Sequence, residues 1–185
     1  MNKATLTATT GPVDRIAGRE RATPPVLVLG LGNLLLGDDG VGLRLLNALE
    51  EEFDPSGGVE FLDGGTQGLA LIGYLADREA VLVLDAMSLG RPPGTVHVLR
   101  GADLERFRAQ RATTAHEGNA LELFETARML GYQWVELAAV GVEPRSIRTG
   151  IGLTAEVESA VDEAGRQART VLGEMVKSYV SGNSR

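Results

Sequence analysis

The sequence contains no cysteine. Disulfide bonds, thiolate metal sites and a cysteine nucleophile are therefore excluded, and any metal ion must be held by oxygen atoms or by one of the two histidines. The absence of cysteine also fits a reducing compartment, so we expect a cytoplasmic protein. No apolar run is long enough to span a bilayer, and we expect no membrane segment.

Positive charge is also scarce, because 18 Lys and Arg face 25 Asp and Glu and give a formal net charge of −7. Phosphate backbones and acidic lipids repel such a surface, so we expect neither nucleic acid nor membrane as a partner. Residues 1–25 are poor in apolar side chains and predict a flexible N-terminal extension, and residues 181–185 a short C-terminal tail. Residues 26–180 are expected to form one domain.

Apolar runs and amphipathic stretches alternate along this domain. The apolar runs predict strands at residues 26–31, 59–62, 80–84, 96–99 and 134–142. Helices are expected at residues 39–53, 68–76, 114–130 and 154–179. The short GRPPGT connection before residue 96 leaves no room for a crossover helix and favours an antiparallel edge strand. The prediction is a single three-layer α/β domain, whose mostly parallel twisted sheet has about five strands with helices on both faces.

Acidic side chains follow the predicted strands where the strands end. Asp38 and Asp39 follow the first strand, Asp63 the second and Asp85 the third, and His116 lies in the later segment TTAHEGN. Because ligands of open α/β sheets bind beyond the carboxyl ends of the strands, we expect these groups to converge there. Two carboxylates and one imidazole suit a borderline divalent ion such as nickel, zinc, cadmium or iron.

The candidate residues differ in what else they could do. Asp38 and Asp39 stand at a helix start, where capping is the expected role of Asp38, while Asp39, one residue further in, is expected to project more readily than Asp38. Asp85 ends an apolar strand, and an ionised carboxylate there is costly unless a cation or donors meet it. His116 falls in the first turn of a predicted helix, which favours the neutral, metal-binding imidazole. His97, on the edge strand, is expected to be structural.

The segment GLGNLLLGDDGVG also raises the alternative of a Rossmann-type nucleotide site. Gly30, Gly32 and Gly37 do not have the GxGxxG spacing, and Asp38 and Asp39 would repel a pyrophosphate. The segment therefore favours a cation over a nucleotide. The spacing of the histidines also lacks the HExxH pattern of helix-borne zinc proteases.

With these residues in view, the chain resembles the hydrogenase maturation proteases, endopeptidases that trim the large subunit of nickel-iron hydrogenases. The resemblance runs from about residue 26 through the last predicted helix. It is carried by five segments in order: GLGNLLLGDDGVG, LDGGTQG, VLDAM with PPGTV, TTAHEGN, and VGVEPRSIRTGIGLT.

The resemblance implies a site and a reaction. Asp39, Asp85 and His116 match the family's metal-binding set, and Asp38 or Asp39 is a candidate for guiding water. The family's substrate-recognition loop matches Asp63, Gly64, Gly65 and Thr66. The family reaction removes a short C-terminal extension from the large-subunit precursor once nickel is inserted, so the nickel is expected to come from the substrate, with zinc or cadmium as other ions that suit the site. A monomer is expected, and a non-catalytic nickel-dependent checkpoint is the alternative that only a cleavage assay separates.

Overall fold

The computed structural model describes residues 23–53, 57–111 and 120–182. Most of the predicted N-terminal extension, the start of the helix expected at residue 114, and His116 lie outside these ranges. In chain order, the elements are β1 (Val26–Leu31), the 3-10 helix η1 (Asp38–Gly40), α1 (Val41–Glu50), β2 (Val59–Gly65), the 3-10 helix η2 (Gly68–Leu75), β3 (Ala80–Ala86), β4 (Val96–Arg100), α2 (Gly101–Arg111), α3 (Ala120–Met129), β5 (Glu136–Val142) and α4 (Ala155–Gly182).

The strands form one five-stranded sheet in the order β2-β1-β3-β5-β4. β1, β2, β3 and β5 run parallel, whereas β4 pairs antiparallel with β5 at the edge. The prediction of a mostly parallel sheet with one antiparallel edge strand is therefore confirmed.

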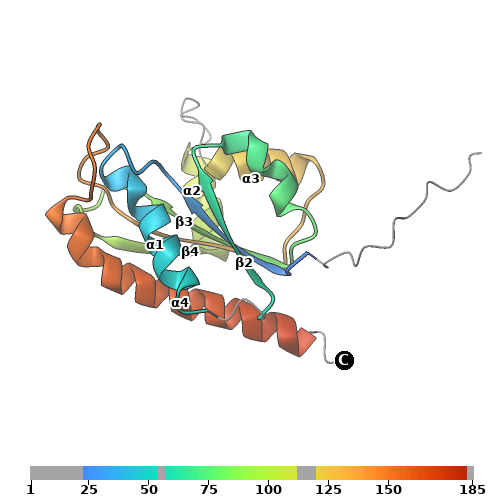
Figure 1. Ribbon diagram of the computed structural model, residues 1–185. Helices are drawn as coiled ribbons and strands as arrows, with labels where there is room; N and C mark the ends of the chain where they lie inside the picture. Colours follow the sequence, from blue (N-terminus) through green and yellow to red (C-terminus); the bar gives the residue numbers. More distant parts are fainter. Residues whose placement is uncertain (1–22, 54–56, 112–119, 183–185) are drawn as a thin grey trace, which may run out of the picture.

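Helices cover both faces of the sheet, as expected for strands that are apolar on both sides (Figure 1). On one face, Val28 and Leu82 pack with side chains of α1 and α4. On the other face, Leu27 and Val81 pack with η2, α2 and α3. Because successive strand residues point to opposite faces, each central strand contributes to both cores.

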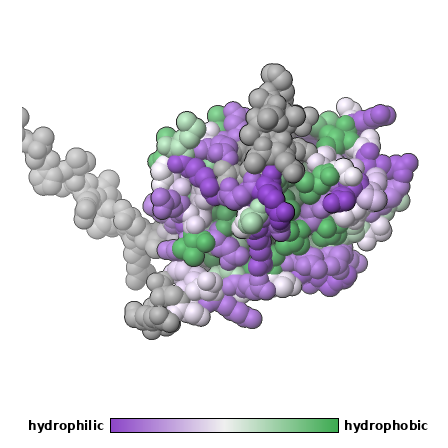
Figure 2. All heavy atoms as spheres, turned by 180° about the vertical axis from the view of Figure 1, so that it is seen from behind, coloured by the Kyte–Doolittle hydropathy of each residue, from purple (hydrophilic) through white to green (hydrophobic). Residues whose placement is uncertain are grey.

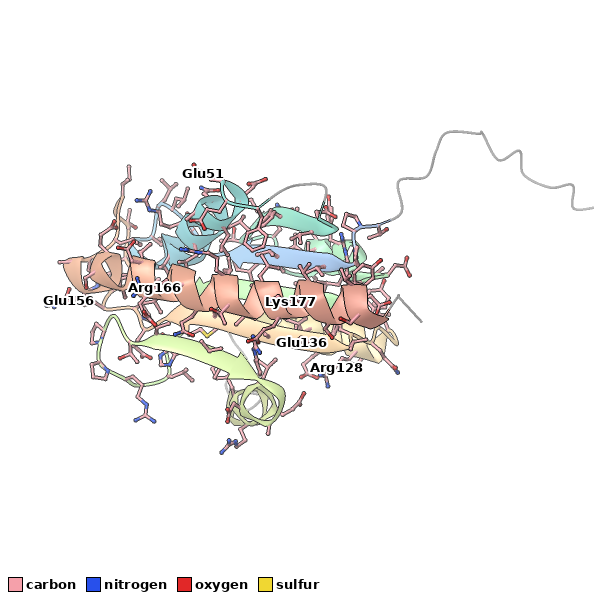
Figure 3. All side chains as sticks on the ribbon, turned by 90° about the horizontal axis from the view of Figure 1, so that it is seen from below. Glu51, Arg128, Glu136, Glu156, Arg166 and Lys177 are labelled. Atoms are coloured by element: carbon pink, nitrogen blue, oxygen red, sulfur yellow. The ribbon has the colours of Figure 1, made fainter. Side chains whose placement is uncertain are left out.

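Helix α4 follows the amphipathic pattern predicted for it and is the longest described helix. Figure 3 looks onto its outer side, along which the charged residues Glu156, Arg166 and Lys177 are spread. Arg100 of the edge strand lies 2.6 Å from Glu174 of α4 and 3.7 Å from Glu136 of β5, so an ion-pair network fastens the edge of the sheet to this helix.

Two expectations about the elements are wrong. The sequence pattern predicts no helix at α2, where charged residues are frequent; in the structure Leu104 is buried and Phe107 partly buried against the core. The second strand was expected to end at residue 62, but β2 continues to Gly65, because Asp63 pairs with Gly30 and Gly65 with Leu31.

Seen from behind the view of Figure 1, the molecule is covered largely by hydrophilic side chains, with smaller groups of apolar residues between them (Figure 2). Within the described ranges, every helix is too short or too polar to cross a membrane.

Candidate active site at the carboxyl ends of β1 and β3

The strand order places the topological switch point of the sheet between β1 and β3. From β1 the chain reaches β2 through α1 on one face, and from β2 it reaches β3 through η2 on the other face. The loops after β1 and β3 therefore diverge at this point, which is where open α/β sheets bind ligands. Gly30 of β1 pairs with Leu84 of β3, so Asp85 lies level with the last residue of β1.

Asp39 packs against the glycine turn that follows β1. Gly32 has a φ of +118°, and a Cβ built on it would lie 1.9 Å from the carbonyl oxygen of Asp39 and 3.7 Å from its Cγ. The Gly32 N–H donates to the carbonyl oxygen of Gly65 at 3.0 Å, which joins this turn to the end of β2. Glycine is required at residue 32 because any side chain would displace Asp39.

A second close approach joins α1 to both central strands. A Cβ on Gly42 would lie 2.3 Å from the carbonyl oxygen of Leu31 and 2.4 Å from that of Leu84. The first turn of α1 therefore rests directly on the ends of β1 and β3, and η1 contacts β3. This packing brings the turn that carries Asp39 to the strand that carries Asp85.

Asp85 is the sixth residue of β3 rather than a residue beyond it. It is half-buried, and one carboxylate oxygen accepts a hydrogen bond of 2.8 Å from the N–H of Ala86. Val81 and Val83 point into the core beneath η2, α2 and α3, so the alternation along the strand places Asp85 on the same face. Helices α2 and α3 flank the segment that contains His116.

His116 itself lies outside the described residues. Of the three ligands predicted from the sequence, the structure describes the two carboxylates, Asp39 and Asp85. Among residues 23–53, 57–111 and 120–182, no three His, Asp or Glu side chains form a group that could hold a metal ion. The described part of the candidate site therefore consists of Asp39 in η1 and Asp85 near the end of β3.

Asp38 holds a distant loop rather than capping its own helix. Its carboxylate is fully buried and accepts hydrogen bonds from the backbone N–H of Arg145, Ser146 and Thr154, and from the Thr154 hydroxyl, at 2.7 to 3.0 Å. Neither η1 nor α1 receives a side-chain cap, so the capping role expected for Asp38 is wrong. Burial raises the pKa of Asp38, but the donors outweigh it and hold the pKa below its ordinary value.

A buried carboxylate that sequence reasoning missed lies directly after β5. Glu143 accepts hydrogen bonds from the N–H groups of Leu89 and Gly90 at 2.8 to 3.0 Å, and its Oε2 lies 2.9 Å from Nε2 of His97. Burial raises the pKa of Glu143, but these donors together lower it below its ordinary value. Glu143 thus fastens the loop after Asp85, and His97 has the structural setting expected for it. The signal available in the sequence was an acid directly after an apolar strand, as at Asp85.

The segment Asp63–Thr66 lies at the edge of the sheet. Asp63 and Thr66 are exposed, whereas Gly64 is buried, and a Cβ on Gly64 would lie 2.8 to 2.9 Å from side-chain atoms of Leu29, Leu31 and Leu71. Glycine lets the end of β2 lie flat on that core. β2 is an outer strand, and its outer edge pairs with no other strand of the described residues.

The backbone amides after β1 are used within the protein, which argues against a phosphate site there. The N–H of Gly32 donates to Gly65, that of Gly37 to Gly150, and that of Asp38 to Ser146. A dinucleotide-binding turn instead directs such groups at the pyrophosphate. The Rossmann-type alternative is therefore not favoured.

The chain is similar to known proteins in sequence and in fold. The profile of a family described as hydrogenase maturation protease matches residues 43–170. The Hydrogenase 2 maturation protease of Escherichia coli is 35% identical over 150 residues, covering 80% of this chain and 91% of the relative. The hydrogenase expression/formation protein HupD of Rhodobacter capsulatus is 32% identical over 163 residues, covering 85% of this chain and 78% of the relative. The solved structure of the hydrogenase maturating endopeptidase HybD from E. coli superposes with a TM-score of 0.71 at 34% identity, covering 80% of this chain and 92% of the other.

Proposed function

Because the chain belongs to the hydrogenase maturation protease family and is an endopeptidase, we propose that it removes the C-terminal extension of a hydrogenase large-subunit precursor after nickel insertion. The observation that supports this proposal is that the first turn of α1, directly after Asp39, rests on the ends of β1 and of β3, the strand that carries Asp85. Two carboxylates at that position suit a divalent cation presented by a substrate.

Nickel is part of the substrate in this proposal. Asp39 and Asp85, with His116 as the third ligand, would face the nickel ion of the loaded precursor. That ion would polarise the carbonyl of the scissile peptide. A set of two carboxylates and one imidazole without a thiolate binds a free ion only moderately. The site would therefore be filled only when a nickel-loaded precursor binds. Cleavage is thereby coupled to completed nickel insertion.

The chain's own groups position the peptide. The free edge of β2 ends at Asp63–Thr66, beside the glycine turn that carries Asp39, so an extended peptide lying along that edge would reach the carboxylates. Asp38 is occupied by four donors, which leaves Asp39 as the candidate for orienting water.

The test is incubation of the purified protein with a large-subunit precursor, loaded with nickel or nickel-free, followed by intact-mass measurement of the precursor. We expect loss of the C-terminal peptide only from the loaded precursor. Equal trimming of both forms would contradict the nickel-dependent recognition, and no trimming of either would contradict the proposed substrate.

A further inference from the structure

Two loops at the carboxyl end of the sheet expose large apolar side chains side by side. Leu34 and Leu35, from the loop after β1, are 53% and 60% exposed, and Ile147 and Ile151, from the loop before α4, are 47% and 89% exposed. These four residues are called here the apolar loop surface. Figure 1 shows both loops at the end of the molecule where the parallel strands end.

The two loops are joined by backbone hydrogen bonds. The N–H of Gly150 donates to the carbonyl oxygen of Leu35, and the N–H of Gly37 donates to that of Gly150, both at 2.9 Å. Bridge pairs also join Leu36 with Gly150 and Gly37 with Ile147. The backbone of Leu35 is therefore held next to Gly150, the residue before Ile151, and the apolar loop surface has a defined arrangement.

The buried carboxylate of Asp38 holds both ends of the loop before α4. The Asp38 carboxylate accepts hydrogen bonds from Arg145 and Ser146 at the start of the loop and from Thr154 at its end. A loop that is fixed so firmly while it presents apolar side chains to water is typical of a binding surface.

Position and charge indicate the occupant. The loop after β1 leads directly into Asp38 and Asp39, so the apolar loop surface is continuous with the site that faces the scissile peptide. Between residues 144 and 153 the charged residues are Arg145, which forms an ion pair with Glu156 of α4, and the exposed Arg148, in a protein of net charge −7. This local positive charge complements an apolar segment that is flanked by a carboxylate.

We infer that the apolar loop surface docks an apolar, carboxylate-flanked segment of the large-subunit precursor, an inference that rests on the proposed function. Leu35 and Ile151 are the main contacts because they are the most exposed of the four. Docking there holds the precursor while its C-terminal peptide lies at Asp39 and Asp85.

The test compares the double variant Leu35→Ser/Ile151→Ser with wild type. We expect the KM for nickel-loaded precursor and the Kd measured by biolayer interferometry to rise about tenfold, with kcat changed by less than about twofold. The matched control is Met129→Ser/Val135→Ser, which removes side chains that are 87% and 78% exposed away from the site and should change neither KM nor Kd. Thermal unfolding of both variants confirms that the fold is retained.

The outcomes separate the two proposals. Unchanged KM and Kd in Leu35→Ser/Ile151→Ser would overturn the docking inference, while trimming by wild type still supports the function. Binding by wild type without trimming would overturn the proposed function, and the Kd of the variant would still decide the docking. A wild-type dimer in sedimentation velocity that the double variant dissociates would assign the surface to a second copy of the chain and overturn the inference.

Discussion

Thr154 donates both its backbone N–H and its hydroxyl to the buried carboxylate of Asp38, at 2.7 and 3.0 Å. The two residues are 116 positions apart in the chain. This contact joins the turn after the first strand to the start of the last helix, and it lies directly beside Asp39.

Replacing Asp38 by Asn should destabilise the protein. The amide keeps one acceptor oxygen but turns an NH2 group toward the N–H donors of Arg145 and Ser146, so we expect the free energy of unfolding to fall by about 2 kcal/mol. Thr154→Val, which removes only the hydroxyl donor, should cost about 1 kcal/mol. Urea denaturation measures both, and an Asp38→Asn protein as stable as wild type would show that these hydrogen bonds contribute nothing net.

Removing any one of the three proposed nickel-facing groups should stop processing without unfolding the protein. We expect Asp39→Asn, Asp85→Asn and His116→Ala each to lower the trimming rate of nickel-loaded precursor by at least about a hundredfold, because each loses a ligand to the ion. Asp162→Asn, on the outer side of α4, is the matched control and should trim normally. Normal trimming by His116→Ala would remove that residue from the site.

Acid should weaken the fold through Glu143. Its pKa in the folded protein is below the ordinary value of 4.5, so its contribution to stability is present above pH 4.5 and is lost as the pH falls through the lower, folded value. The stability difference between wild type and Glu143→Gln should therefore be constant above about pH 5.5 and shrink as the pH is lowered toward about 2.5. Denaturant titrations across this range measure it, and a difference independent of pH would contradict the assignment.

Replacing Gly42 by Ala should push α1 away from the ends of β1 and β3. The Cβ of Gly42→Ala would meet two backbone carbonyl oxygens, which cannot move aside as a side chain could, so we expect a loss of about 3 kcal/mol in the free energy of unfolding. Trimming should fall too, because η1 would shift relative to Asp85. Gly73→Ala is the control, since nothing lies within 4 Å of a Cβ there. Equal stability of the two variants would show that α1 does not rest on the strand ends.

The sheet and the positions of Asp39 and Asp85 could be predicted from the sequence because both follow from local pattern. Apolar runs mark buried strands, and the carboxyl ends of parallel strands meet at one edge, so residues after those runs must lie there. Helix α2 could not be predicted in this way, because its sequence is rich in charged residues without a clear apolar stripe, and tertiary packing decides its conformation.

The roles of Asp38 and Glu143 could not be predicted because their partners are distant in the chain. Arg145 is 107 positions from Asp38, and Leu89 is 54 positions from Glu143. A carboxylate at a helix start looks like a cap in any local window. Only the folded arrangement shows that its donors belong to another loop.

Hydrogen bonds hold the loop before α4 at Arg145 and Ser146, at Gly150 and at Thr154. Between residues 147 and 151 these contacts use backbone atoms only, so the side chains can vary while the hydrogen bonds remain; on the inferred docking, client preference would change there while Asp39 and Asp85 keep their positions. Transplanting these five positions between related enzymes is accordingly a direct route to retargeting one processing enzyme to another client.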